Sequence, residues 1–100
     1  MRIIARGTLR QFWQTPNHSD AERPLIEWYH LISRAHWRTP QDIKQDLRHA
    51  SILKNGRVVF NIGGNKYRII ASIDYTRQIL WIKFVGTHAQ YDTIDAEQTP

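Results

Sequence analysis

The sequence predicts a single α+β domain, in which N-terminal helices pack on one face of a twisted antiparallel β-sheet. Apolar residues recur at helical spacing up to about residue 50 and with a period of two beyond it. Short turns rich in Gly and Asn separate the stretches of period two, as in strands that pair with their neighbours in the chain. The length of 100 residues fits one domain, taken here as residues 1–100. A hydrophobic content of 41% argues against disorder.

The first segment predicts a short strand followed by a short helix. Residues 3–5 form an apolar run that could be an opening strand. Leu9, Phe12 and Trp13 then have the i, i+3, i+4 spacing of one helix face. Pro16 ends this helix, because the residue before a proline is disfavoured in the helical conformation.

Two further helices follow. Residues 19–22, Ser-Asp-Ala-Glu, have the pattern of a capping box, and apolar residues repeat at helical spacing over 25–35. Pro24 fits this start poorly, so the helix either begins nearer to Glu22 or is distorted there. Residues 39–42, Thr-Pro-Gln-Asp, predict a capped start with proline at the first helical position.

The second half predicts a meander of antiparallel strands at residues 51–54, 57–62, 66–73 and 78–85. Asn55-Gly56 is a preferred two-residue hairpin turn, because both residues tolerate positive φ. Further turns are expected at 63–65 and 74–77.

Alternation along these strands predicts two different faces. The apolar set should lie under the helices: Val58, Phe60, Ile62, Tyr67, Ile69, Ala71 and Ile73. The expected open face carries Arg57, Asn61, Lys66 and Arg68. Cations with few acidic neighbours suit phosphate binding, although one polar face is also usual for an antiparallel sheet without such a function. Trp13, Trp28 and Trp81 are expected in the core.

The formal net charge is +5, and the charged residues are distributed unevenly along the chain. Residues 1–47 carry seven basic and five acidic side chains (net +2), and residues 48–90 carry seven basic and one acidic (net +6). The acidic C-terminal tail, residues 91–100, carries three acidic side chains (net −3) and is expected to pack or fray. A basic half indicates either a surface for nucleic acid or an acidic partner, or simply a solvated basic surface.

Several classes of protein are excluded or disfavoured. The absence of cysteine excludes a disulfide scaffold and a cysteine nucleophile. No pair of histidines has zinc-site spacing, so we expect no metal and no cofactor. The apolar runs are too short for a membrane span, and the N-terminus lacks the apolar stretch of a signal peptide. A cytoplasmic location is therefore expected.

The segment after the last predicted strand concentrates reactive side chains. Residues 86–92 read Gly-Thr-His-Ala-Gln-Tyr-Asp. His88 can exchange a proton near neutral pH, Tyr91 can donate a hydrogen bond or stack on a base, and Asp92 can orient the imidazole. The alternative is an ordinary loop in which His88 makes only local hydrogen bonds.

Two motifs together carry a resemblance to a known family. Residues 57–68 and 84–95 resemble the HigB toxin family, within the wider group of RelE-type ribosome-dependent mRNA interferases. Residues 2–10, 21–29 and 37–44 agree, so the similarity extends over about residues 1–95. The resemblance implies a RelE-like fold and the toxin of a type II toxin–antitoxin pair. Such toxins cleave mRNA in the A site of the 30S subunit and so inhibit translation.

The resemblance also implies partners. They are mRNA, the ribosome and a HigA-type helix-turn-helix antitoxin, with operator DNA contacted only through the toxin–antitoxin complex and no membrane involved. The alternative functions are a noncatalytic basic module that binds RNA or the ribosome, and an interaction protein that grips an acidic partner.

The chemistry of RNA cleavage assigns roles to these residues. A base must take the proton of the 2′-hydroxyl, an acid must protonate the leaving 5′-oxygen, and cations must stabilise the phosphate, with no need for a metal. Arg68 is expected on the phosphate, supported by Lys66 and Arg57, with His88 as the acid–base residue. Tyr91 is a second proton-transfer candidate or a stacking platform. The expected RNA-binding set is Arg57, Asn61, Lys66, Arg68 and Asp92.

Overall fold

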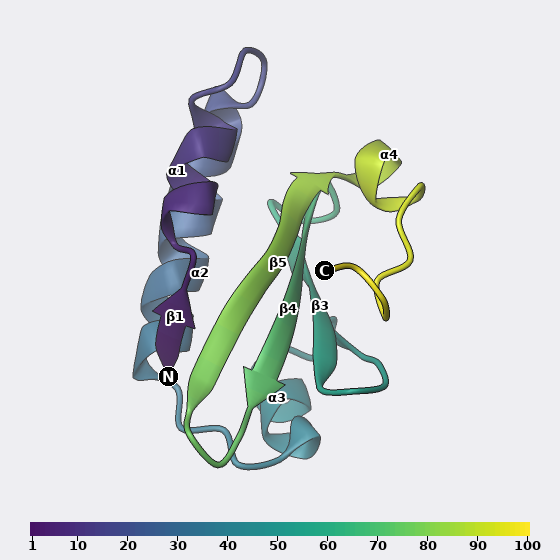
Figure 1. The fold of residues 1–100 in the computed structure, drawn as a ribbon. Coiled ribbons are helices and arrows are strands. Elements are labelled where there is room, and N and C mark those ends of the chain that lie inside the picture. The colour runs from purple at the N-terminus through teal and green to yellow at the C-terminus, as the bar shows by residue number, and fades with distance from the viewer.

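A five-stranded sheet in the order β1-β5-β4-β3-β2 forms the centre of the computed structural model, which describes residues 1–100 (Figure 1). The strands are β1 (Arg2–Ile4), β2 (Ser51–Ile52), β3 (Arg57–Ile62), β4 (Tyr67–Asp74) and β5 (Ile79–Thr87). The helices are α1 (Gly7–Trp13), α2 (Glu22–Arg34), α3 (Pro40–Asp46) and α4 (His88–Tyr91), with a 3-10 turn, η1, at Ser19–Ala21. The predicted α+β class is confirmed.

The sheet is mixed, not purely antiparallel. Strands β2 to β5 form the expected antiparallel meander, but β1 pairs in parallel with the free edge of β5, with Ile3 opposite Leu80. Alternation of side chains reveals a strand but not its direction, which depends on where the chain returns to the sheet.

Helix starts follow local hydrogen bonding. The expected capping box at Ser19 does not form: residues 19–21 make η1, and α2 begins at Glu22 without a side-chain cap. Pro24 lies in the first turn of α2, where a missing N–H removes no helical hydrogen bond. The predicted cap of α3 is present, because Thr39 and Asp42 form a reciprocal capping box.

The main core lies between the sheet and helices α1 to α3. Leu25 and Ile32 of α2 and Ile43 of α3 are fully buried against strand residues such as Phe60 and Ile69. Trp28 and Trp37 also belong to this core, and Trp13 packs against it half-buried. The prediction of helices on one face of the sheet is confirmed.

The prediction that Trp81 is a core residue is wrong. Trp81 lies between Leu80 and Ile82, which both enter the core, and successive side chains of a strand point to opposite faces. Trp81 is therefore half-buried on the outer face of β5. A bulge follows, because Ile70 pairs with Phe84 whereas Ala71 pairs with Ile82. The extra residue shifts the alternation by one position, so Phe84 faces outward and Val85 packs on the main core.

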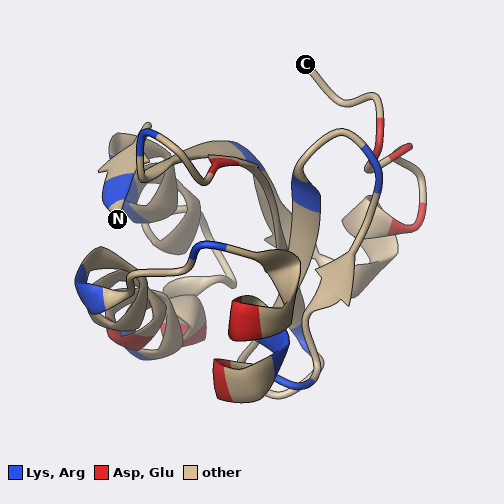
Figure 2. Cartoon of the chain, turned by 90° about the horizontal axis from the view of Figure 1, so that it is seen from below, with Lys and Arg blue, Asp and Glu red and all other residues tan.

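The face predicted to be open is covered in part by the end of the chain. Val59 and Ile70 on this outer face are buried with Ala96, and Leu53, Phe84, Tyr91 and Ile94 pack around them. Figure 1 shows the last segment running back beside β3 and β4. The acidic tail therefore packs, and Figure 2 marks its acidic positions in red near the C-terminus. Val59 and Ile70 are apolar, so covering them with the C-terminal segment removes apolar surface from water and stabilises the fold.

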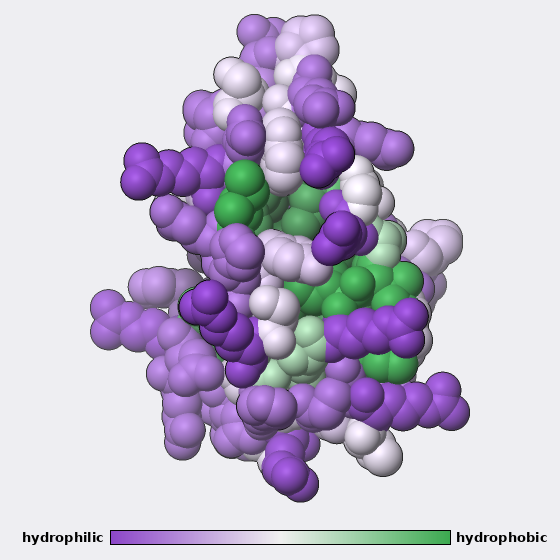
Figure 3. Space-filling model, turned by 90° about the vertical axis from the view of Figure 1, so that its left-hand side faces the viewer, coloured by the Kyte–Doolittle hydropathy of each residue, from purple (hydrophilic) through white to green (hydrophobic).

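The opposite side of the molecule is formed by β1, α1 and α2. Figure 3 shows hydrophobic side chains exposed in the middle of this otherwise hydrophilic face. A groove of about 590 Å³ lies there between α1 and α2, with Leu9, Trp13 and Ile26 among its lining residues. No helix of the structure is both long enough and apolar enough to cross a membrane.

Candidate functional site

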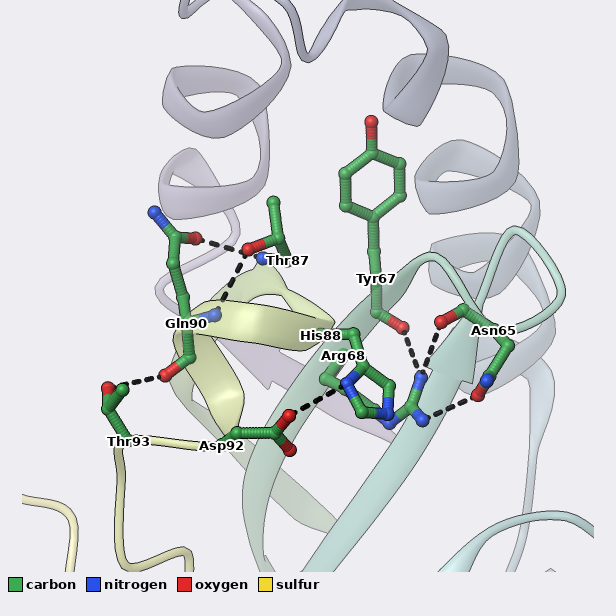
Figure 4. A network of polar contacts seen from close by, with 8 residues as sticks. All are labelled: Asn65, Tyr67, Arg68, Thr87, His88, Gln90, Asp92 and Thr93. Carbon is green, nitrogen blue, oxygen red and sulfur yellow. Dashed lines mark hydrogen bonds and ion pairs between the residues drawn. The ribbon is translucent and has the colours of Figure 1, made fainter.

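The ends of β4 and β5 bring the candidate residues of the last motif together. Arg68 pairs across the sheet with Gly86, and the backbone N–H of His88 donates to the carbonyl of Lys66 at 3.1 Å. These contacts set the start of α4 beside the start of β4. The sheet therefore brings Arg68 and His88 near each other (Figure 4).

Helix α4 has only one turn, but a capping box of Thr87 and Gln90 closes its N-terminus. The N–H of Gln90 donates to the Thr87 hydroxyl at 3.1 Å, and the N–H of Thr87 donates to the Gln90 side chain at 2.9 Å. Such reciprocal caps satisfy helix N–H groups that have no partner within the helix. The alternative of an ordinary loop does not describe this segment, because His88 and Tyr91 lie in a capped helical turn and Asp92 follows it directly.

Arg68 is the one buried charged side chain in the structure, with 8% of its surface exposed. Its Nη1 donates to the carbonyls of Asn65 at 3.1 Å and Tyr67 at 3.3 Å, and its Nη2 donates to the Asn65 side chain at 2.5 Å. None of the ion pairs in the structure includes Arg68. Its positive charge is therefore held in place by neutral groups and has no carboxylate partner.

Tyr91 supports Arg68 from the other side. The guanidinium carbon lies 5.8 Å from the centroid of the Tyr91 ring, within the range of a cation–π contact. The same ring packs against the small outer cluster of Val59, Ile70 and Ala96. Tyr91 thus links α4, the C-terminal segment and the arginine.

His88 and Asp92 form a pair one helical turn apart. His88 Nδ1 lies 3.1 Å from Asp92 Oδ2, and the two side chains are 46% and 58% exposed. A carboxylate that accepts from Nδ1–H leaves Nε2 free to accept or donate a proton. The expected orienting role of Asp92 agrees with this geometry.

Lys66 points away from this group. Its ammonium is ion-paired with Asp20 at the start of the helical layer, and the Tyr67 hydroxyl donates to the same carboxylate. The hydrogen bond from Lys66, followed by that from Tyr67, lowers the pKa of Asp20 below its ordinary value. The same contact with Asp20 raises the pKa of Lys66, so the ammonium stays charged.

Arg57 and Asn61 occupy opposite ends of β3. Asn61 is exposed and pairs with Arg68, so it lies beside the arginine. Arg57 is four residues away, about 13 Å along the strand. Its Nη1 donates to the carbonyl of Ala96 at 3.3 Å, so the C-terminal segment occupies its guanidinium. The structure thus brings together Asn61, Arg68, His88, Tyr91 and Asp92, and leaves Arg57 and the charged group of Lys66 apart.

Three residues that shape the site were not singled out from the sequence. Asn65 was expected only as a turn residue, yet it holds Arg68 through both its carbonyl and its side chain. Gln90 caps α4, and the Thr-x-x-Gln pattern of residues 87–90 was the signal for it. Gly86 pairs with Arg68 across the sheet. A Cβ added at Gly86 would lie 2.4 Å from Phe84 Cζ and 2.7 Å from Gln90 Oε1, so no larger residue fits without a shift.

The remaining histidines take no part in this group. His18 stacks on Phe12 with ring centroids 4.4 Å apart, which gives it a packing role. No three His, Cys, Asp or Glu side chains gather in a way that would hold a metal ion.

Comparisons with known proteins agree with this description. Residues 21–94 match the family model of HigB_toxin, the RelE-like toxic component of a toxin–antitoxin system. The chain is 28% identical over 97 residues to a protein of Escherichia coli O6:H1 named mRNA interferase HigB, with 94% of this chain and 91% of the relative covered. It is also 28% identical over 99 residues to the mRNA interferase toxin HigB of Escherichia coli K12, with 96% and 92% covered.

Proposed function

Because the chain belongs to the HigB family of RelE-like toxins, we propose that it is an mRNA endoribonuclease that cuts translated mRNA in the ribosomal A site and so inhibits translation. The relatives from two Escherichia coli strains are both named mRNA interferases. Because translating ribosomes are in the cytoplasm, the proposed location of the protein is also the cytoplasm.

The observation that carries this proposal is the position of Arg68 beside the His88–Asp92 pair. A buried guanidinium without a carboxylate partner attracts a phosphate, and guanidinium groups bind phosphate oxygens through paired N–H donors. A histidine oriented by a carboxylate can move a proton. Phosphate binding and proton transfer are the two requirements for cleaving an RNA strand.

The reaction needs two proton transfers. In one, His88 takes the proton of the 2′-hydroxyl as the 2′-oxygen bonds to phosphorus, or it protonates the 5′-oxygen as the P–O5′ bond breaks. The Tyr91 hydroxyl or a water molecule serves the other transfer. The products are a 2′,3′-cyclic phosphate and a 5′-hydroxyl. Arg68 stabilises the negative charge that gathers on the phosphate oxygens, and Asp92 keeps the imidazole oriented.

The other expected residues have supporting roles. Tyr91 holds Arg68 through its ring, and its hydroxyl is the second candidate for proton transfer. Asn61 lies next to Arg68 and can contact the RNA. Lys66 and Arg57 act through their positive charge, Lys66 most strongly when Asp20 releases it. A site with so few reacting groups depends on the ribosome to align the mRNA strand.

The toxin family implies an antitoxin partner. We propose a HigA-type antitoxin with a helix-turn-helix domain, which would bring the toxin to operator DNA only as part of the complex. The solvent-exposed His88 and Asp92 leave the site open to mRNA in the free toxin.

Mapping of cut ends on programmed ribosomes tests the proposal. Ribosomes with a defined A-site codon are incubated with the wild type, His88→Ala, Arg68→Ala and the control Arg34→Ala, which changes an exposed charge on α2. We expect A-site cuts from the wild type and control and strongly reduced cuts from the two site variants. Binding without cuts by the wild type would instead indicate a noncatalytic ribosome-binding module.

A further inference from the structure

The largest groove in the structure adjoins Arg68 but is not used by the proposed chemistry. It encloses about 800 Å³, within the usual range for sites that take small ligands. It lies between the α3–β2 connection and the part of β3 beyond its pairing with β2, and the β3–β4 turn closes one end. Asn65 lines this end, and its side chain holds Arg68.

The floor of the groove is aromatic. Trp28 of α2 and Phe60 of β3 both line it, with ring centroids 5.4 Å apart in an edge-to-face arrangement. Trp28 is 6% exposed, and its indole N–H has no hydrogen-bond partner. Burial of a donor without an acceptor is unfavourable, so a small movement of the Trp28 ring that brings its N–H to an acceptor in the groove would be favourable.

The rim of the groove carries free polar side chains. Gln45 and Asn61 make no side-chain hydrogen bond in the structure, and Arg48 makes no ion pair. The one acidic residue of the lining, Asp46, already accepts a hydrogen bond from Trp37 at 2.8 Å. Amide groups can match the polar edge of a base, and a guanidinium can stack on its face.

We propose that this groove holds one base of the mRNA, that of a nucleotide next to the phosphate at Arg68, and thereby sets the sequence preference of cleavage. The proposal rests on the proposed function and adds a specificity subsite to it. An apolar floor bordered by free amides and a guanidinium suits the recognition of an unstacked base, because the amides can match its polar edge and the guanidinium can stack on its face. Asn65 both lines the groove and holds Arg68, so a base in the groove would belong to a nucleotide close to the cleaved bond in the mRNA.

A binding experiment tests the groove without depending on cleavage. The His88→Ala variant, labelled with ¹⁵N, is mixed with a short single-stranded oligoribonucleotide, and the indole N–H signals are followed by NMR. A Trp28→Phe variant assigns the signal of Trp28. We expect this signal to shift on addition of RNA and that of Trp13, which lines the separate groove between α1 and α2, to stay in place.

Matched variants define the contact. We expect Asn61→Ala or Arg48→Ala to weaken binding of the oligonucleotide at least about fivefold, which is the low end of the loss for one base contact. Arg34→Ala should leave this binding unchanged. The proposal is overturned if the Trp28 signal does not move at about 1 mM RNA, a concentration above the weak end of non-specific nucleic-acid binding.

Cleavage on ribosomes separates the two proposals. With mRNAs that differ in one A-site nucleotide, Asn61→Ala should cut with a flatter nucleotide preference than the wild type. If the wild type cuts and this variant keeps the same preference, the groove proposal fails alone. If the wild type does not cut, the proposed function fails, and the Trp28 shift still decides the groove. A different result would assign the groove to a protein partner and overturn the proposal. In that case the groove variants would cut like the wild type but would no longer be inhibited by a co-expressed antitoxin.

Discussion

The guanidinium of Arg68 lies 5.8 Å from the centre of the Tyr91 ring, so an arginine of the central strand is tied to the short helix that carries His88. Asn65 holds the same guanidinium through two hydrogen bonds. The phosphate-binding and proton-transfer groups of the proposed site are therefore parts of one packed unit, and each can be tested separately.

Arg68→Lys tests whether the planar guanidinium is needed beyond its charge. Lysine keeps the charge but cannot donate to both Asn65 acceptors and also lie flat on Tyr91. We expect cleavage to fall at least about tenfold, and further in Arg68→Ala, in the range known for loss of one donor to a developing charge. Cut-end mapping on ribosomes measures this. Full activity of Arg68→Lys would contradict the assigned role.

Tyr91 separates ring from hydroxyl. Tyr91→Ala removes packing on the outer cluster and should destabilise the protein by about 1–2 kcal/mol, since the side chain is only half-buried. Tyr91→Phe keeps the ring and should stay within about 0.5 kcal/mol of the wild type. Thermal unfolding compares the two, and an equal loss in both would show that the hydroxyl and not the ring supports the fold.

The His88–Asp92 pair should affect activity without affecting stability. Both side chains are exposed, so His88→Ala and Asp92→Asn should change the free energy of unfolding by less than about 0.5 kcal/mol. Loss of His88 should reduce cleavage by about 10² to 10⁴, and Asp92→Asn by less, because an amide oxygen still accepts from Nδ1. Single-turnover cleavage measures both, and a larger effect from Asp92 would reverse their roles.

Gly86→Ala should damage the site from a distance. The added Cβ would lie 2.4 Å from Phe84 Cζ and 2.7 Å from the Gln90 side chain that caps α4. Phe84 is packed in the outer cluster, so relief of this clash costs about 1–3 kcal/mol of stability. Chemical denaturation measures the loss, and Gly7→Ala, where a Cβ meets no atom within 4 Å and the backbone has no positive φ, is a control for a glycine substitution without a clash.

Alkaline pH should weaken the fold through its tyrosines. Burial raises the pKa of Tyr67 and Tyr75 above the ordinary 10.0, with the nearby carboxylates Asp20 and Asp42 adding to it. A raised pKa stabilises the protein below the ordinary value, and this stability is lost as pH rises through the folded values. Melting temperatures should therefore fall above about pH 10. Tyr75→Phe should make this fall shallower, and an unchanged slope would contradict the assignment.

Most of the fold followed from local patterns in the sequence. The change of apolar period near residue 50 identified the helices and strands, Asn55-Gly56 identified a hairpin, and Thr39-Pro40 identified a helix start. The Gly-Thr-His motif at residues 86–88 also pointed to the site, because its residues are neighbours in the chain. Hydrogen bonds and side-chain periodicity within a few residues are properties of the local sequence, so they can be predicted without the fold.

Only the tertiary structure decided which distant groups meet. Asp20 takes the ammonium of Lys66 from 46 positions away, and Ala96 takes the guanidinium of Arg57 from 39 positions away. The tail covers Val59 and Ile70, and the bulge in β5 follows an outward-facing Trp81. Each of these depends on how separate surfaces fit when the elements pack, and such complementarity has no local pattern. The sequence thus supplied candidate residues, whereas packing determined which of them lie together.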